Sequence, residues 1–85
     1  MHSKVSITRK ATKAIARLPD TIYQRVKDAI ADLANEPRPS GCKKLRGYKD
    51  SYRIWVGRDY RVLYRVDDQE QRIEVFWVGS RQDAY

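Results

Sequence analysis

The residues that could do chemistry in this chain of 85 residues are arginines and tyrosines of its C-terminal half. The usual catalytic sets are missing, since the only histidine is His2, the only cysteine is Cys42, and no zinc-ligand spacing or phosphate-binding glycine loop occurs. Arginine stays protonated and clamps phosphate through two hydrogen bonds, so it can stabilise a phosphoryl transition state but is a poor base. Because RNA supplies its own nucleophile, the 2′-hydroxyl, an arginine-rich site with a tyrosine could cleave RNA without a metal or another cofactor.

Three segments with alternating apolar residues, 52–56, 60–66 and 73–78, must position these side chains. Alternation with a period of two predicts half-buried strands. One face would be almost wholly apolar, with Tyr52, Ile54, Val56, Val62, Tyr64, Val66, Ile73, Val75 and Trp77. The other face would combine Arg53, Arg61 and Arg65 with Trp55, Leu63, Phe76 and Val78. Cations interleaved with aromatic rings suit phosphates and bases.

Two turns set the expected register of these strands. The first, Gly57-Arg58-Asp59, suits a tight hairpin that places Ile54 opposite Val62 and Trp55 opposite Arg61. The second, within 67–72 and centred between residues 69 and 70, would pair Tyr64 with Val75, Leu63 with Phe76, and Arg65 with Glu74. The last pair has opposite charges, which supports this register.

The N-terminal half of the sequence predicts two helices that would pack on the apolar face of the sheet. Residues 4–8 alternate like a short edge strand, and Thr8 can cap a helix over 9–18 that ends at Pro19. A second amphipathic helix starts at Asp20 or Thr21 and ends before Pro37. We therefore predict one domain, 1–85, of the α+β class: β-α-α-β-β-β, an antiparallel four-stranded sheet with a helical hairpin on one face, leaving Arg53, Arg61 and Arg65 open to solvent.

The net charge of +7 favours nucleic acid or an acidic protein as the partner, although a basic domain without a nucleic-acid role is the alternative. The most cationic segment is 39–50, an expected loop with Lys43, Lys44, Arg46 and Lys49. These side chains either bind phosphate or are simply solvated. A lone cysteine fits a reducing cytoplasm, and no run of about 18 apolar residues predicts a membrane span.

From KKLRGYKDSYRIWVGRDYRVLYRVDD to IEVFWVGSRQDAY, the sequence resembles the RelE/ParE superfamily of bacterial toxins. The core "YRI-V-DYRVLY" and the terminal "VGSR---Y" are its most specific pieces. The resemblance implies a toxin of a type II toxin–antitoxin system. RelE-like members are ribosome-dependent endoribonucleases that cut mRNA in the ribosomal A site, whereas ParE-like members poison DNA gyrase and lack the catalytic set.

The RelE-like pattern implies roles for four residues. It matches Arg53 in the second strand, Arg61 in the third, Arg81 after the fourth and Tyr85 near the C-terminus. By resemblance, Arg61 would stabilise the scissile phosphate, Arg81 would assist the leaving 5′-oxygen, and Tyr85 would orient the 2′-hydroxyl or stack on a base. The expected product is a 2′,3′-cyclic phosphate.

One departure from the pattern concerns Trp55, which stands where RelE-like sites often carry a lysine. Trp55 would either pack against Arg61 or stack on a base, and Lys43, Lys44 or Arg46 could replace the missing cation. With Lys49 and Arg65, these residues are the expected contacts to RNA and the ribosome.

The hypothesis is therefore a RelE-like mRNA interferase, held by an antitoxin that is acidic where it meets Arg53, Arg61 and Arg81. A ParE-like gyrase poison and a non-catalytic RNA-binding member of the same fold are the alternatives.

Overall fold

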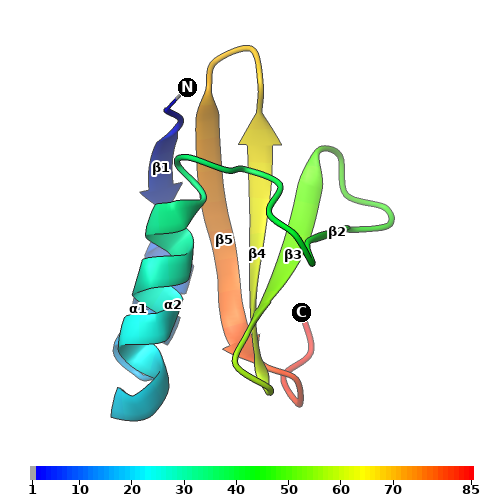
Figure 1. The fold of residues 1–85 in the computed structure, drawn as a ribbon. Coiled ribbons are helices and arrows are strands. Elements are labelled where there is room, and N and C mark those ends of the chain that lie inside the picture. Colours follow the sequence, from blue (N-terminus) through cyan, green and yellow to red (C-terminus); the bar gives the residue numbers. More distant parts are fainter. Residues whose placement is uncertain (1) are drawn as a thin grey trace.

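The computed structural model describes residues 2–85. Its elements are β1 (Lys4–Ile7), α1 (Arg9–Ala16), α2 (Asp20–Asp32), β2 (Lys43–Lys44), β3 (Ser51–Val56), β4 (Tyr60–Asp67) and β5 (Arg72–Ser80). The strands form one sheet in the order β1-β5-β4-β3-β2 (Figure 1). This arrangement confirms the α+β class, the helical pair and the antiparallel meander of β3, β4 and β5. Among residues 2–85, no helix is both long and apolar enough to cross a membrane.

Two details of the predicted sheet are wrong. β1 pairs with β5 in parallel, with Val5 beside Ile73, so the sheet is mixed rather than antiparallel throughout. The predicted loop 39–50 also contains a fifth strand, β2, which pairs with β3. Two lysines give no apolar alternation from which to recognise a strand. The strand exists because β3 otherwise has an unpaired edge that accepts it.

The helices cover the predicted apolar face. The Thr8 hydroxyl accepts a hydrogen bond from the Ala11 amide at 3.2 Å, which confirms the predicted cap of α1. Ile15 from α1 and Val26 and Ile30 from α2 are buried against the sheet. The core consists of Ala11, Ile15, Ile22, Val26, Ile30, Leu33, Ile54, Val56, Val62, Tyr64, Val66, Ile73, Val75 and Val78. The sheet face that is away from the helices is thereby left for other contacts.

A β-bulge changes the register between β4 and β5. Tyr64 lies opposite Val75, as predicted, but Leu63 lies opposite Trp77 and not opposite Phe76. One extra residue in β5 reverses the alternation beyond the bulge. Val78 therefore turns into the core, where it is 4% exposed, and Trp77 moves to the open face. The predicted positions of Trp77 and Val78 are both wrong for this reason.

The segment after α2 is fastened to the sheet by polar contacts. The buried Tyr64 hydroxyl donates to the Pro37 carbonyl at 2.7 Å. Arg38 donates to both oxygens of Asp68, at 2.8 and 3.1 Å, and to the Tyr52 hydroxyl at 2.9 Å. The hydrogen bonds to Arg38 lower the pKa of Asp68 below its usual value. Asp68 therefore helps to hold this segment in place.

Candidate functional site

Strand pairing sets predicted site residues in two rows on the open face. One row of residues opposite one another on neighbouring strands consists of Lys43, Arg53, Leu63 and Trp77. The adjacent row consists of Trp55, Arg61 and Gly79. Residues directly opposite each other on neighbouring strands share a face and lie close together. Arg53 and Arg61 are therefore on one surface, and the predicted pairing of Trp55 with Arg61 is confirmed.

Trp55 is the centre of a cationic patch. Its ring is 40% exposed, and the guanidinium carbons of Arg53 and Arg81 lie 5.2 and 5.1 Å from the ring centre. These distances are typical of cation–π contacts. The cation–π partners of the Trp55 ring are Arg53 and Arg81, while Arg61 is its neighbour in register on β4.

Arg81 is held by the hairpin between β3 and β4. Its amide donates to the Asp59 carbonyl at 2.6 Å, and its Nη2 donates to the Arg58 carbonyl at 3.0 Å. Its Nε is also 3.6 Å from the Asp59 carboxylate. Asp59 is not among the predicted site residues, since an acidic residue in a tight turn is ordinary. The hairpin nevertheless holds a predicted catalytic arginine beside Trp55.

Arg61 is less open than predicted. Its guanidinium carbon lies 5.0 Å from the centre of the Trp77 ring, and its Nη2 donates to the Asp83 carbonyl at 2.8 Å. The Nε of Arg61 is buried and has no hydrogen-bond partner among residues 2–85. Arg61 thus lies on the face away from the helices, as predicted, but it is only partly exposed, since the Asp83 carbonyl and the Trp77 ring contact it.

Tyr85 completes this C-terminal segment. Its ring centre is 5.5 Å from those of Tyr48 and Phe76 and 5.9 Å from that of Trp77. Together with Leu63, which is 2% exposed, these rings form a small apolar cluster on the open face. Strand alternation did not reveal the cluster, since the bulge places Trp77 in it. Arg61 and Tyr85 thus share a contact with one ring.

The remaining predicted contacts are more widely spread. Lys43 is in register with Arg53, but Lys44 is in register with Tyr52 and so lies on the opposite side of the sheet. Arg65 is exposed and opposite Glu74, two rows along β4 from Arg61 and beyond the row that contains Leu63. Residues 44–49, including Arg46 and Lys49, border a shallow hollow. The structure therefore gathers Arg53, Arg61, Arg81, Trp55, Tyr85 and Lys43, and leaves Lys44 and Arg65 apart.

The chemistry of the gathered set is that of cations and one phenol. In the described part of the chain, no three His, Cys, Asp or Glu side chains come together to hold a metal ion. Guanidinium groups on an aromatic platform can bind and neutralise a phosphodiester. Exposed rings beside them can stack on bases.

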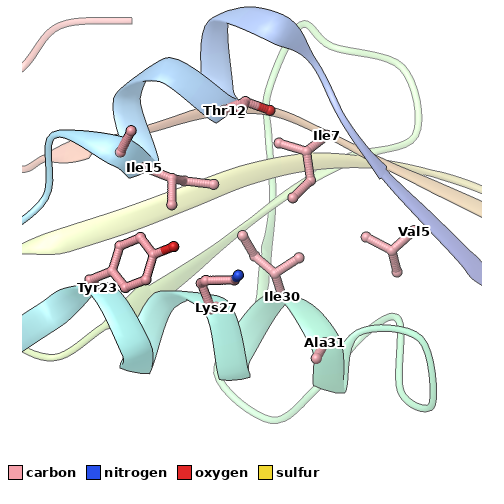
Figure 2. Close-up of a pocket in the computed structure, with 9 residues that line it drawn as sticks. Val5, Ile7, Thr12, Ile15, Tyr23, Lys27, Ile30 and Ala31 are labelled. Atoms are coloured by element: carbon pink, nitrogen blue, oxygen red, sulfur yellow. The ribbon is translucent and has the colours of Figure 1, made fainter.

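A separate feature lies at the β1 edge of the molecule. α1, α2 and β1 enclose an apolar groove of about 420 Å³ (Figure 2). Ile7 and Tyr23, which are 38% and 36% exposed, contribute to its wall. The groove contains none of the predicted site residues, so it is a surface independent of the arginines.

Comparison with known proteins shows which family this chain belongs to. Residues 5–85 match the model of the ParE toxin of the type II toxin–antitoxin system parDE. The chain belongs to this toxin family. The toxin RelE of Mycobacterium tuberculosis is 33% identical to it over 82 residues, which cover 95% of this chain and 84% of the relative. The mRNA interferase toxin RelE of Escherichia coli is 31% identical over 74 residues, or 86% and 77% of the two chains.

Solved structures give the same result for this toxin. The RelE chain of the archaeal RelE–RelB complex from Pyrococcus horikoshii superposes with a TM-score of 0.83 at 32% identity, covering 99% of this chain and 100% of the other. A chain of the intact RelBE toxin–antitoxin complex of E. coli superposes with a TM-score of 0.80 at 27% identity, covering 95% of this chain and 99% of that chain. The resemblance to the RelE/ParE superfamily is therefore confirmed, and the chain is the toxin of a type II toxin–antitoxin system.

Proposed function

We propose that this toxin is a ribosome-dependent mRNA interferase of the RelE kind. The observation that carries the proposal is the gathering of Arg53, Arg61, Arg81 and Tyr85 on the open face around two tryptophan rings. Its relatives support it, since the E. coli protein is named an mRNA interferase. The ribosome would present the mRNA in its A site to this face, and Lys43, Lys44, Arg46, Lys49 and Arg65 would contribute contacts to RNA or the ribosome.

The proposed reaction is an internal transesterification. The 2′-oxygen attacks the adjacent phosphorus, the bond to the 5′-oxygen breaks, and a 2′,3′-cyclic phosphate and a free 5′-hydroxyl result. Arg61 would neutralise the charge that builds on the phosphate oxygens, and Arg81 would assist the departing 5′-oxygen. Tyr85 would orient the 2′-hydroxyl. Because arginine is a poor base, the group that removes the 2′ proton comes from the bound ribosome–mRNA complex or from Tyr85.

A ParE-like gyrase poison is the second candidate, because the matching family model is named for ParE. The resemblance implies that ParE-like members lack the catalytic set. The arrangement of Arg61, Arg81 and Tyr85 therefore favours RNA cleavage over this alternative.

The proposed regulator is a cognate antitoxin, as in the solved RelE–RelB complexes. Its acidic residues would meet Arg53, Arg61 and Arg81, where opposite charges speed association. An apolar segment of the same antitoxin would fill the groove between α1, α2 and β1, beside the unpaired edge of β1. Both toxin and antitoxin would act in the cytoplasm, where mRNA is translated.

Primer extension on a translated reporter mRNA after expression of the toxin tests the function. Discrete cuts inside codons, lost when translation is blocked, are expected. Cuts that persist without translation would indicate a ribosome-independent nuclease. Intact mRNA together with inhibited supercoiling by purified gyrase would replace the proposal with the ParE-like one.

A further inference from the structure

We propose that Trp55 is a positioning residue, whose ring orients the guanidinium groups of Arg53 and Arg81 toward the phosphates of bound RNA. This inference rests on the proposed function, because it concerns how the same site binds its substrate. It adds that Trp55 acts through these two arginines and not by stacking on a base. A ring without charge thereby contributes to the binding of a phosphate chain.

The Trp55 ring lies between the two arginines along the direction of the strands. Arg53 is two residues before Trp55 on β3. Gly79 of β5 is in the same row as Trp55, and Arg81 is two residues further on. Since β3 and β5 are both antiparallel to β4, they run in the same direction, so Arg53 and Arg81 start on opposite sides of this row. Their guanidinium carbons nevertheless lie at nearly equal distances from the ring centre, 5.2 and 5.1 Å.

A contact with a ring suits an arginine that must also bind phosphate. Each guanidinium group lies over the Trp55 ring, and such a cation–π contact uses the charge of the group but none of its N–H donors. Arg53 makes no ion pair among residues 2–85, so no carboxylate neutralises its charge. The donors of Arg53 thus stay available for phosphate oxygens, while the ring restricts where they point.

The other contacts of Arg81 do not fix its direction. Its Nε lies 3.6 Å from the Asp59 carboxylate, and both side chains are 59% exposed. Exposed ion pairs contribute little, because water and salt screen them. The hydrogen bond from Nη2 to the Arg58 carbonyl holds one end of the guanidinium group. A second contact is required to fix its direction, and the Trp55 ring provides it.

The same two contacts make Trp55 a poor platform for a base. The ring is 40% exposed, but a base that stacks on a covered face must displace the guanidinium group there. This displacement would remove an arginine contact from the RNA chain to which the base belongs. Trp55 is therefore expected to contribute equally to the binding of RNA chains with and without bases.

Trp55→Leu tests this role, since leucine is apolar but has no ring, and Trp55→Phe is the matched control that keeps a ring. Fluorescence anisotropy compares two probes: a single-stranded oligonucleotide with 2′-O-methyl riboses, which cannot be cleaved, and an abasic chain of the same length and charge. Trp55→Leu is expected to weaken binding of both probes by about tenfold, and Trp55→Phe by no more than about threefold. A loss confined to the probe with bases would overturn the proposal in favour of base stacking.

The loss must depend on the two arginines. In a background with Arg53→Ala and Arg81→Ala, Trp55→Leu is expected to cause no further loss of binding, because the ring then has no cation to orient. An equal loss in this background would show that Trp55 acts independently of the arginines and would refute the positioning role. Unchanged binding by Trp55→Leu in the otherwise wild-type chain would refute it as well.

A spectroscopic readout needs neither RNA nor cleavage. Protons over an aromatic ring experience its ring current, so the side-chain δ protons of Arg53 and Arg81 should resonate upfield of those of the exposed Arg65. Trp55→Leu should return them to the range of Arg65, while Trp55→Phe should retain part of the shift. Wild-type resonances in the range of Arg65 would contradict the contact itself. If the toxin cleaves no mRNA, the proposed function fails, while this measurement and the binding of the probes still report on Trp55.

Discussion

The guanidinium group of Arg61 lies on the indole ring of Trp77, with 5.0 Å between the guanidinium carbon and the ring centre. Gly79, the residue opposite Arg61 in β5, makes room for this ring. A Cβ atom at Gly79 would lie 2.6 Å from the Trp77 ring, closer than two carbon atoms can approach. The Trp77 ring therefore packs against the guanidinium group of Arg61. The position of this ring depends on the absence of a side chain at residue 79.

Arg61→Ala should reduce cleavage of mRNA by about 10²–10³-fold, because a donor that stabilises transition-state charge is lost. Ribosome binding should change little, since it is spread over many cations. Single-turnover cleavage on programmed ribosomes and a separate binding assay provide the measurement. Arg65→Ala is the matched control, being an exposed arginine on the same strand. Equal losses of cleavage and binding for Arg61→Ala would make Arg61 a docking residue.

Gly79→Ala should lower the free energy of unfolding by roughly 1–3 kcal/mol, because the new methyl group forces the Trp77 ring to move. Cleavage should fall as well, since Arg61 loses its support. Urea denaturation followed by tryptophan fluorescence measures the first effect. Arg72→Ala, at an exposed position of the same strand, controls for general perturbation of β5. Unchanged stability of Gly79→Ala would show that the ring does not occupy this position.

Tyr64→Phe should lower the free energy of unfolding by about 1 kcal/mol near neutral pH, since the hydrogen bond to Pro37 is lost. Burial, with a smaller contribution from Cys42, raises the pKa of Tyr64 above its ordinary value. The unfolded chain therefore ionises first, from about pH 10, and the wild type loses stability as pH rises further. The Tyr64→Phe variant has no phenol group at residue 64 to ionise. The stability difference between the two proteins should narrow between pH 8 and roughly pH 11 in urea titrations, and a constant difference would contradict the raised pKa.

Tyr23→Asp should weaken binding of the cognate antitoxin without altering mRNA cleavage by the free toxin. Tyr23 is a wall of the apolar groove, where a buried carboxylate would be costly. Calorimetric titration of toxin with antitoxin measures the effect. Lys13→Asp, a charge change on α1 that does not line the groove, is the control. Equal losses for both variants would indicate a general charge effect.

The association rate of toxin and antitoxin should fall as salt is added, because the arginine surface faces acidic residues in the proposed complex. Stopped-flow mixing at several ionic strengths measures it. Removing Arg53 or Arg81 should flatten this dependence. A rate that is indifferent to ionic strength would place the antitoxin away from these arginines.

The sequence alone determined both helices, every strand except β2, and the antiparallel order of β3, β4 and β5. Alternation identified β3, β4 and β5, Thr8 marked the start of α1, and the tight hairpin set Trp55 opposite Arg61. These features depend on residues that are neighbours in the chain or are joined by a short turn, so local patterns contain them. The family resemblance rested on the same continuous segments.

Only the tertiary structure decided the details that shape the site. The bulge that exchanges Trp77 and Val78 reflects how two strands and the helices above them pack, which alternation within one strand does not encode. The pairing of β2 depends on a free edge of β3. The segment over Arg61 depends on Tyr48, Phe76 and Trp77, which meet Tyr85 only after the sheet has formed. Contacts between residues far apart in the chain thus set how open the central arginine is.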